Sequence, residues 1–147
     1  VDIGEVDCFA DTNFSRVCTF DARNHFEKRG SGTLVGITSV SGIRGRASNY
    51  IYGSAKSGFN VYLSGLRNRQ AKKGVHVVTV LLGFVATKMT KNIRLPKLIT
   101  ANAKLVGLHV KKACIHKKDI IYVKPIWRWI MLIIKMLPER YFKTINF

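Results

Sequence analysis

The sequence predicts an α/β fold built on a parallel β-sheet, and three segments carry this prediction. Two apolar segments, 32–39 and 75–81, are rich in β-branched residues and have the length of buried strands. A longer segment with helical periodicity, 48–73, lies between them. Strands that alternate with helices are typical of parallel sheets, because parallel neighbours need a crossover connection.

The limits of the helices are predicted from their end signals. Residues 12–28 are expected to form a helix that runs into the turn at 29–32. Ser48 is the expected N-cap of the helix at 48–73, and Gly74 is its natural stop. The apolar residues of this helix recur about every 3.6 positions and form one stripe of Ile51, Ala55, Phe59, Tyr62 and Leu66.

The last third of the chain predicts a helix at 101–115 and a short strand at 120–123. The following segment, 125–137, is apolar but shorter than the ~20 residues that span a bilayer, and two basic residues interrupt it. Two interpretations of this segment stay open. It is either an interfacial helix on an anionic membrane, which suits its tryptophans and cations, or a helix packed over a substrate pocket or the sheet edge.

Charge is distributed unevenly along the chain. Lys and Arg number 25 against 8 Asp and Glu, which gives a formal net charge of +17. No acid occurs between Glu27 and Asp119, which excludes paired glycosidase carboxylates, an acidic calcium loop and a local Ser-His-Asp set there. No zinc-finger or RNA-recognition pattern is present, so we expect no specific nucleic-acid partner. The basic residues indicate a solvated surface, with an anionic membrane or a phosphate-bearing substrate as the alternative.

The cysteines and histidines predict neither disulfides nor a metal site. Cys8, Cys18 and Cys114 are odd in number, far apart and without a Cys-x-x-Cys motif, which favours a reducing, cytoplasmic compartment. No His-Glu-x-x-His pattern occurs, and His76 lies within an apolar strand, as structural histidines do. We therefore expect no metal.

The candidate reactive groups lie at the end of the first predicted strand and at the start of the next helix. Tyr52 and Lys56 are four residues apart and therefore share one helical face. A lysine ammonium about one turn away favours the phenolate form of a tyrosine, which suits acid/base catalysis. Ser39 precedes Tyr52 by thirteen residues and can hold a carbonyl or alcohol oxygen. These three groups suffice for proton transfer to a carbonyl that receives a hydride.

These segments, in this order, resemble the C-terminal half of the short-chain dehydrogenase/reductase family. The segments that carry the resemblance are 32–39, 48–56, 62–67, 75–81 and 83–87. The resemblance extends from about Asn13 to Thr90. Within this range the sequence is similar to the branch of the family that includes decaprenylphosphoryl keto-sugar reductases. The resemblance implies a partial Rossmann-like, doubly wound parallel sheet.

The resemblance also implies roles for single residues. Tyr52 would be the catalytic acid/base, Lys56 would tune it and bind the nicotinamide ribose, and Ser39 would orient the substrate oxygen. Asn13 would support a water relay to Lys56, although a helix N-cap remains its alternative role. The residues that would contact NAD or NADP, with NADP favoured, are Tyr52, Lys56, Gly83, Val85 and Thr87.

Two departures from the family pattern bear on activity. Leu82 stands where the family loop has a proline, so this loop lacks the stiffening of a fixed φ. No glycine-rich dinucleotide turn precedes the strand at 32–39, and the chain begins at Val1 rather than methionine. We therefore expect a partial reading frame or the remnant of a longer gene. The strand at 32–39 would then lack one parallel neighbour, with an exposed edge and an uncovered apolar face.

Together these features predict a single partial domain over 1–147 with an amphipathic tail at 125–147. Its expected function is hydride transfer between NAD(P) and a small-molecule or lipid-linked carbonyl or alcohol substrate. The family resemblance implies a homo-oligomer through the helix of Tyr52 and Lys56, where Gly58 and Gly65 permit close packing. The tail suits peripheral contact with an anionic membrane. The alternatives are a catalytically inactive fragment and a basic membrane-surface binding protein.

Overall fold

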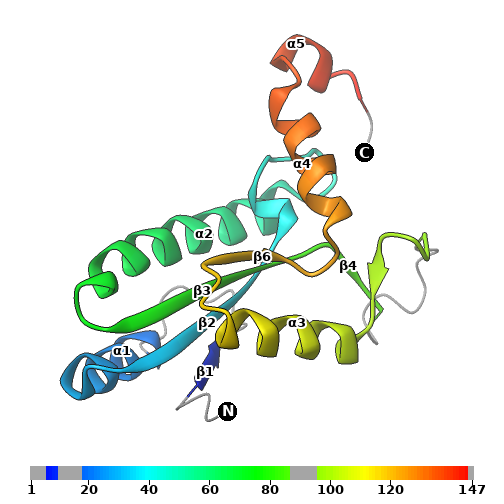
Figure 1. Cartoon of the computed structure of the whole chain (residues 1–147). Helices are drawn as coiled ribbons and strands as arrows, with labels where there is room; N and C mark the ends of the chain where they lie inside the picture. The colour runs from blue at the N-terminus through cyan, green and yellow to red at the C-terminus, as the bar shows by residue number, and fades with distance from the viewer. Residues whose placement is uncertain (1–5, 10–17, 87–95, 146–147) are drawn as a thin grey trace.

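The computed structural model describes residues 6–9, 18–86 and 96–145 (Figure 1). Its main sheet has four parallel strands in the order β1-β2-β3-β6. These strands are β1 (Val6–Phe9), β2 (Gly32–Ser39), β3 (Val75–Leu82) and β6 (Ile120–Tyr122). The α/β class and the parallel sheet predicted from the sequence are therefore confirmed.

The prediction that β2 lacks a parallel neighbour on one side is wrong. β1 pairs with β2 in parallel register, with Val6 opposite Thr33 and Phe9 opposite Gly36. β3 pairs with the other side of β2 along its whole length. β1 has only four residues, and one of them is Asp7, so it lacks the apolar run that marks β2 and β3 in the sequence. β2 is an inner strand of the sheet.

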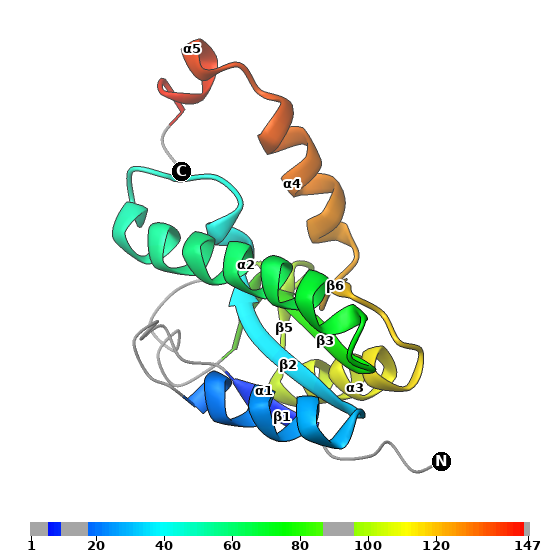
Figure 2. The ribbon, with the colours of Figure 1, turned by 90° about the vertical axis from the view of Figure 1, so that its left-hand side faces the viewer.

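Helices cover both faces of the sheet, so the predicted uncovered apolar face is also wrong. α1 (Cys18–Arg29) and α2 (Tyr50–Ala71) lie on one face, and α3 (Ala103–Ile115) lies on the other (Figures 1 and 2). The buried cluster on the first face contains Phe26, Leu34, Phe59, Leu63, Leu66, Val75 and Val77. The buried cluster on the second face includes Val35, Val78, Val80, Ala113, Cys114 and Ile121.

α2 has nearly its predicted length, and its buried face matches the predicted stripe at Phe59 and Leu66 but not in the first turns of the helix. Its N-cap is Asn49 instead of Ser48, and no side-chain capping bond forms; Gly74, with a φ of 73°, follows the helix. The buried positions are Gly53, Lys56, Phe59, Leu63, Leu66 and Gln70. Ile51 is 72% exposed, and Ala55 is exposed too. In the first turns of α2, the small residue Gly53 faces the segment that follows β2. The residues of the predicted stripe in these turns therefore face away from the core.

The segments that follow β3 include a second pair of strands and two C-terminal helices, the first of which packs at the carboxyl end of the main sheet. β4 (Phe84–Val85) and β5 (Thr100–Ala101) form a separate parallel pair. α4 (Ile126–Met136) follows β6 and leads away from the sheet to α5 (Glu139–Phe142) (Figure 1). One face of α4 buries Trp127 and Met131 in a third cluster with Val40 and Leu81. Within the described part of the chain, no helix has both the length and the apolar character needed to cross a bilayer.

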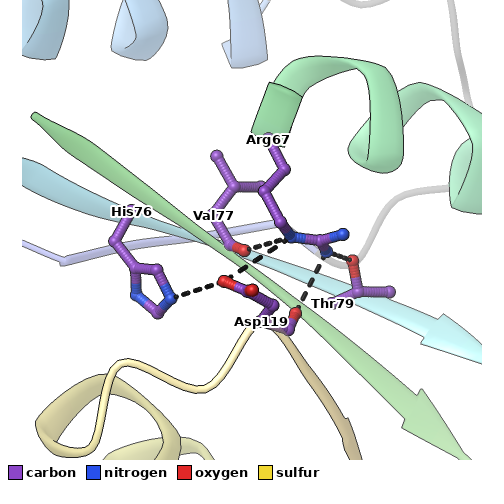
Figure 3. Close-up of polar contacts among 5 residues, drawn as sticks. All are labelled: Arg67, His76, Val77, Thr79 and Asp119. Carbon is purple, nitrogen blue, oxygen red and sulfur yellow. Dashed lines mark hydrogen bonds and ion pairs between the residues drawn. The ribbon is translucent and has the colours of Figure 1, made fainter. Parts of the chain in front are cut away.

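A polar cluster joins α2 to the start of β6 (Figure 3). Arg67 donates from Nε to the Val77 carbonyl at 2.9 Å, and from Nη2 to the Thr79 hydroxyl at 2.5 Å and the Asp119 carbonyl at 3.0 Å. His76 Nε2 lies 3.2 Å from the Asp119 carboxylate. Because β6 pairs with β3 only from Thr79 onward, the guanidinium replaces a strand partner for the Val77 carbonyl.

Candidate active site

The carboxyl end of β2 leads directly into a short 3-10 helix, η1 (Val40–Gly42). Ser39 ends β2 and is buried. Its Oγ accepts a hydrogen bond from the Ser41 amide at 3.2 Å. The hydroxyl of Thr38 lies 3.4 Å from the Lys56 carbonyl, to which it donates. These contacts hold the serine in a defined position under the first turns of α2.

Two glycines allow η1 and α2 to approach each other closely. A Cβ on Gly42 would lie 2.6 Å from the carbonyl carbon of Lys56 and 2.7 Å from the Ser57 amide nitrogen. A Cβ on Gly53 would lie 3.0 Å from the Ser41 carbonyl oxygen. The backbone after β2 and the start of α2 are therefore packed as one unit, a role that sequence reasoning did not assign to Gly42.

The structure brings Tyr52 and Lys56 together on the face of α2 predicted from their spacing. Lys56 is only 5% exposed, and its Nζ lies 3.5 Å from the Ile37 carbonyl oxygen of β2. The same ammonium is 5.8 Å from the centroid of the Tyr52 ring. Tyr52 itself is 45% exposed. A buried cation thus lies beside an accessible phenol, where charge interactions are stronger than in bulk water.

A hollow of about 530 Å³ opens beside Tyr52. It is lined by Ser48, Asn49, Tyr50, Ile51, Tyr52 and Ala55. The exposed Ile51 and Ala55, which the predicted stripe assigned to the core, contribute apolar surface here. Of the predicted catalytic residues that the structure describes, Tyr52 lines the hollow, whereas Ser39 and Lys56 are buried and do not.

The residues predicted to contact a cofactor are only partly described. Gly83 lies against Trp127 of α4, and a Cβ at this position would overlap the indole ring. Val85 belongs to β4 and is half-buried. Asn13 and Thr87 lie outside the described residues. Gly83 therefore has a packing role that its sequence context did not reveal.

Arg44 is a further contact residue that sequence reasoning missed. Its guanidinium donates to the carbonyls of Ile134 at 2.5 Å and Leu137 at 2.6 Å. It also pairs with the Glu139 carboxylate at 2.9 Å and lies 3.8 Å from the centroid of the Phe142 ring. The loop after η1 is thereby joined to α4 and α5. No local pattern marks such a residue, because its partners lie about ninety positions further along the chain.

Comparison with known sequences identifies related proteins. Residues 5–97 match the family model described as short chain dehydrogenase. An uncharacterised oxidoreductase of Mycobacterium tuberculosis is 32% identical over 110 residues, which are 75% of this chain and 44% of that protein. Acetoacetyl-CoA reductase of Cupriavidus necator is 36% identical over 108 residues, 69% of this chain and 44% of that enzyme. The chain thus spans less than half the length of these relatives.

Solved structures share the fold at low sequence identity. A short-chain dehydrogenase from Sphingobium yanoikuyae in complex with NADPH superposes with a TM-score of 0.67 at 18% identity, covering 82% of this chain and 52% of that one. A short chain dehydrogenase from Burkholderia cenocepacia in complex with NADP gives a TM-score of 0.66 at 19% identity, covering 80% and 51%. The fold predicted from the sequence is the fold of these proteins.

Proposed function

Because the chain belongs to the short chain dehydrogenase family, we propose that it acts in an oxidoreductase that moves a hydride between a nicotinamide cofactor and a carbonyl or alcohol. The observation that carries this proposal is the buried ammonium of Lys56 beside the accessible ring of Tyr52. NADP is the favoured cofactor, with NAD as the alternative. The NADP-bound structures that share the fold support this choice.

Tyr52 is the proposed proton donor and acceptor. In the direction of reduction, a nicotinamide cofactor, when bound, would supply the hydride that the carbonyl carbon accepts. The Tyr52 hydroxyl gives its proton to the carbonyl oxygen, and the buried charge of Lys56 stabilises the phenolate that remains. An ammonium presents three donor hydrogens, so Lys56 also fits the hydroxyls of a ribose.

Ser39 is the proposed positioning group for the substrate oxygen. Its Oγ accepts from the Ser41 amide, which leaves the serine O–H to donate to a carbonyl or alcohol oxygen. Asn13 remains the proposed support for a water relay, and Gly83, Val85 and Thr87 remain the proposed cofactor contacts. The proposed substrate class is a small-molecule or lipid-linked carbonyl or alcohol, as the sequence resemblance to the keto-sugar reductase branch would imply.

A homo-oligomer through α2 is part of the proposal. Val61 is 70% exposed on this helix, and a Cβ on Gly58 or Gly65 would meet nothing within 4 Å. Small residues beside an exposed aliphatic side chain allow a second helix to approach closely. A second copy of the chain is the proposed partner on this face.

Peripheral membrane contact is a second candidate function, and α4 favours it. Trp129 is 64% exposed on the side of α4 that points away from the buried Trp127 and Met131. Tryptophan next to cations suits the interface of an anionic bilayer. This function is compatible with the oxidoreductase proposal, since it uses different residues.

Titration of the 147-residue chain with NADPH and NADH, followed by nicotinamide fluorescence, tests the cofactor site. We expect saturable binding that weakens at least tenfold in Lys56→Met. Lys72→Met, at the exposed end of the same helix, is the matched control and should bind within about twofold of the parent. Circular dichroism establishes that each variant is folded. A folded parent chain that binds neither nucleotide contradicts the proposal and favours the inactive-fragment alternative.

Tyr52→Phe separates catalysis from binding. It should leave NADPH affinity within a few-fold of the parent, because it removes only a hydroxyl. Carbonyl reduction, measured as NADPH oxidation in the protein that carries this segment, should fall by roughly 100-fold or more. Turnover close to that of the parent would rule out Tyr52 as the acid/base.

A further inference from the structure

A cavity of about 680 Å³ lies between α2 and α4, outside the candidate active site. β3 and β6 form its floor, α2 and α4 form its walls, and η1 closes one end. Neither Ser39, Tyr52 nor Lys56 lines it. Its volume is in the range of small-molecule sites. The proposed hydride transfer does not use this cavity.

The lining of the cavity is positively charged. Arg128 and Lys135 of α4 supply this charge, and none of the lining residues is acidic. Arg67 of α2 also lines the cavity, but its guanidinium is paired with the Asp119 carboxylate at 3.9 Å. Arg128 and Lys135 are two helical turns apart and share one side of α4. The charge of Arg128 acts on the neighbouring Tyr122, whose pKa is raised by burial and lowered in part by this cation. An anion is the group that such a lining attracts.

The same cavity continues into exposed apolar surface. Trp129 and Leu132 line it, and Ile133 and Met136 extend the apolar side of α4 beyond it. All four of these side chains are exposed. A cationic pocket that opens onto an apolar helix face matches a molecule with an anionic head and a hydrocarbon chain.

One polar atom of the wall lacks a partner. The side-chain oxygen of Asn60, on α2, is buried without a hydrogen-bond partner among the described residues. This oxygen is shielded from the cavity as well as from solvent, so it is not counted among the groups that would contact a bound molecule.

We propose that the cavity between α2 and α4 binds the head group of an anionic phospholipid from a membrane surface, an inference that rests on the membrane contact of α4 proposed above and names its ligand. Arg128 and Lys135 contact the phosphate, and Trp129 and Leu132 contact the start of the acyl chain. A second copy of the chain fits this surface less well. In a twofold dimer through this surface, Arg128 and Lys135 of one copy would face the same cations of the other copy. The two copies would repel each other, since the net charge of the chain is +17.

Vesicle sedimentation with the full 147-residue chain tests the site. Phosphatidylglycerol vesicles should bind, and phosphatidylcholine vesicles should not. Arg128→Gln with Lys135→Gln should weaken binding roughly 30-fold, since each cation near an anionic surface contributes a factor of about five. The matched control is Lys111→Gln with Lys112→Gln on the exposed side of α3, which should weaken binding less than threefold. Equal losses in both pairs would mean diffuse attraction and would overturn the proposed site.

Tryptophan quenching locates the bound chain. Vesicles of phosphatidylglycerol with brominated acyl chains should quench the fluorescence of the parent. Trp129→Phe should lose most of this quenching while still sedimenting with the vesicles, because only the buried Trp127 remains. Unquenched Trp129 in the vesicle-bound parent would overturn the proposal.

Two further experiments test the alternative ligands of this cavity, inorganic phosphate and a second copy of the chain. Inorganic phosphate at constant ionic strength should not release the chain from vesicles; release would indicate a simple phosphate site and overturn lipid binding. Sedimentation velocity should show no change in self-association when Arg128 and Lys135 are replaced by Gln. A change would assign this surface to a second copy, which also contradicts the proposal.

Discussion

Arg67 shows how a single side chain can complete a β-ladder. The Val77 carbonyl points to the side of β3 on which β6 starts two residues later, so it has no strand partner there. Arg67 supplies a donor, and the same guanidinium also holds the Thr79 hydroxyl and the Asp119 carbonyl (Figure 3). A planar group with several donors in fixed directions suits this task better than a lysine ammonium does.

Arg67→Met should lower the free energy of unfolding by about 1–3 kcal/mol, because it leaves a buried carbonyl without a donor. Arg69→Met is the matched control on the same helix. Arg69 is mostly exposed and pairs with Glu27 at 3.3 Å, so its loss should change stability by about 1 kcal/mol or less. Urea unfolding followed by circular dichroism measures both. Equal effects would show that Arg67 acts only as a surface charge.

The lowered pKa of His76 predicts that the folded protein loses stability in mild acid. Burial lowers the pKa of His76 below 6.5, and the Asp119 carboxylate opposes this shift only in part; the nearby charges of Lys117 and Arg67 lower the pKa further. The unfolded chain therefore takes up a proton near pH 6.5, whereas the folded chain takes it up at a lower pH. Between these two values the unfolded state binds more protons, so the free energy of unfolding decreases as pH falls.

Urea unfolding between pH 8 and pH 5 measures this effect. His76→Gln should flatten the pH dependence below about pH 6.5. His116→Gln, at an exposed position after α3, serves as the control and should keep the slope of the parent. An unchanged slope in His76→Gln would assign the pH dependence to other groups.

At the scale of elements, Arg44 connects the loop after η1 to the two C-terminal helices. Its two bonds to carbonyls lie at the end of α4, where four carbonyls of any helix lack partners within the helix. A cation is also favourable at this end of a helix dipole. The interaction therefore stabilises the last turn of α4 and sets the start of α5.

Arg44→Met should increase the hydrogen-exchange rates of the amides in α4 and α5, and it should lower the unfolding free energy by about 1–3 kcal/mol. Arg44→Lys should give an intermediate result, because it keeps the charge but not the forked geometry. Arg140→Met, an exposed position on α5, is the control. If exchange in α4 is the same in Arg44→Met and the control, the contact does not hold the helix.

The elements that the sequence predicts well are those with a strong local signal. β2 has its predicted limits, and β3 and α3 differ from theirs by one or two residues, because apolar runs and helix ends are local. β1 and η1 depend on pairing and packing with distant segments, so no local pattern announces them. The buried face of α2 was predicted wrongly at Ile51 because the contact of Gly53 with Ser41 decides the rotation of the helix.

The same distinction applies to the candidate site. The four-residue spacing of Tyr52 and Lys56 specifies a shared face, and the structure has this arrangement. The burial of Lys56 against the Ile37 carbonyl was not predictable, since it depends on how closely α2 approaches β2. Gly42 allows η1, which follows β2, to contact α2 closely, but a glycine that follows a strand in a sequence usually indicates no more than a turn.

At the scale of the whole molecule, the exposed face of α2 around Val61 leads us to expect self-association. Val61→Glu should weaken dimer formation at least tenfold, because it places like charges opposite each other across a twofold interface. Leu98→Glu, another exposed apolar position, is the control and should leave the dimer unchanged. Sedimentation velocity over a range of concentrations measures both. A parent chain that stays monomeric throughout the range contradicts this prediction.

The position of α4 in the chain has a consequence for biosynthesis. Trp127 and Met131 cover Val40 and Leu81, yet they are translated about fifty residues after the end of β3. At about 5–20 residues per second, roughly 2–10 seconds pass before the ribosome has added them. During this interval the nascent chain already has the residues of its central strands, while Val40 and Leu81 at their carboxyl end still lack the helix that covers them.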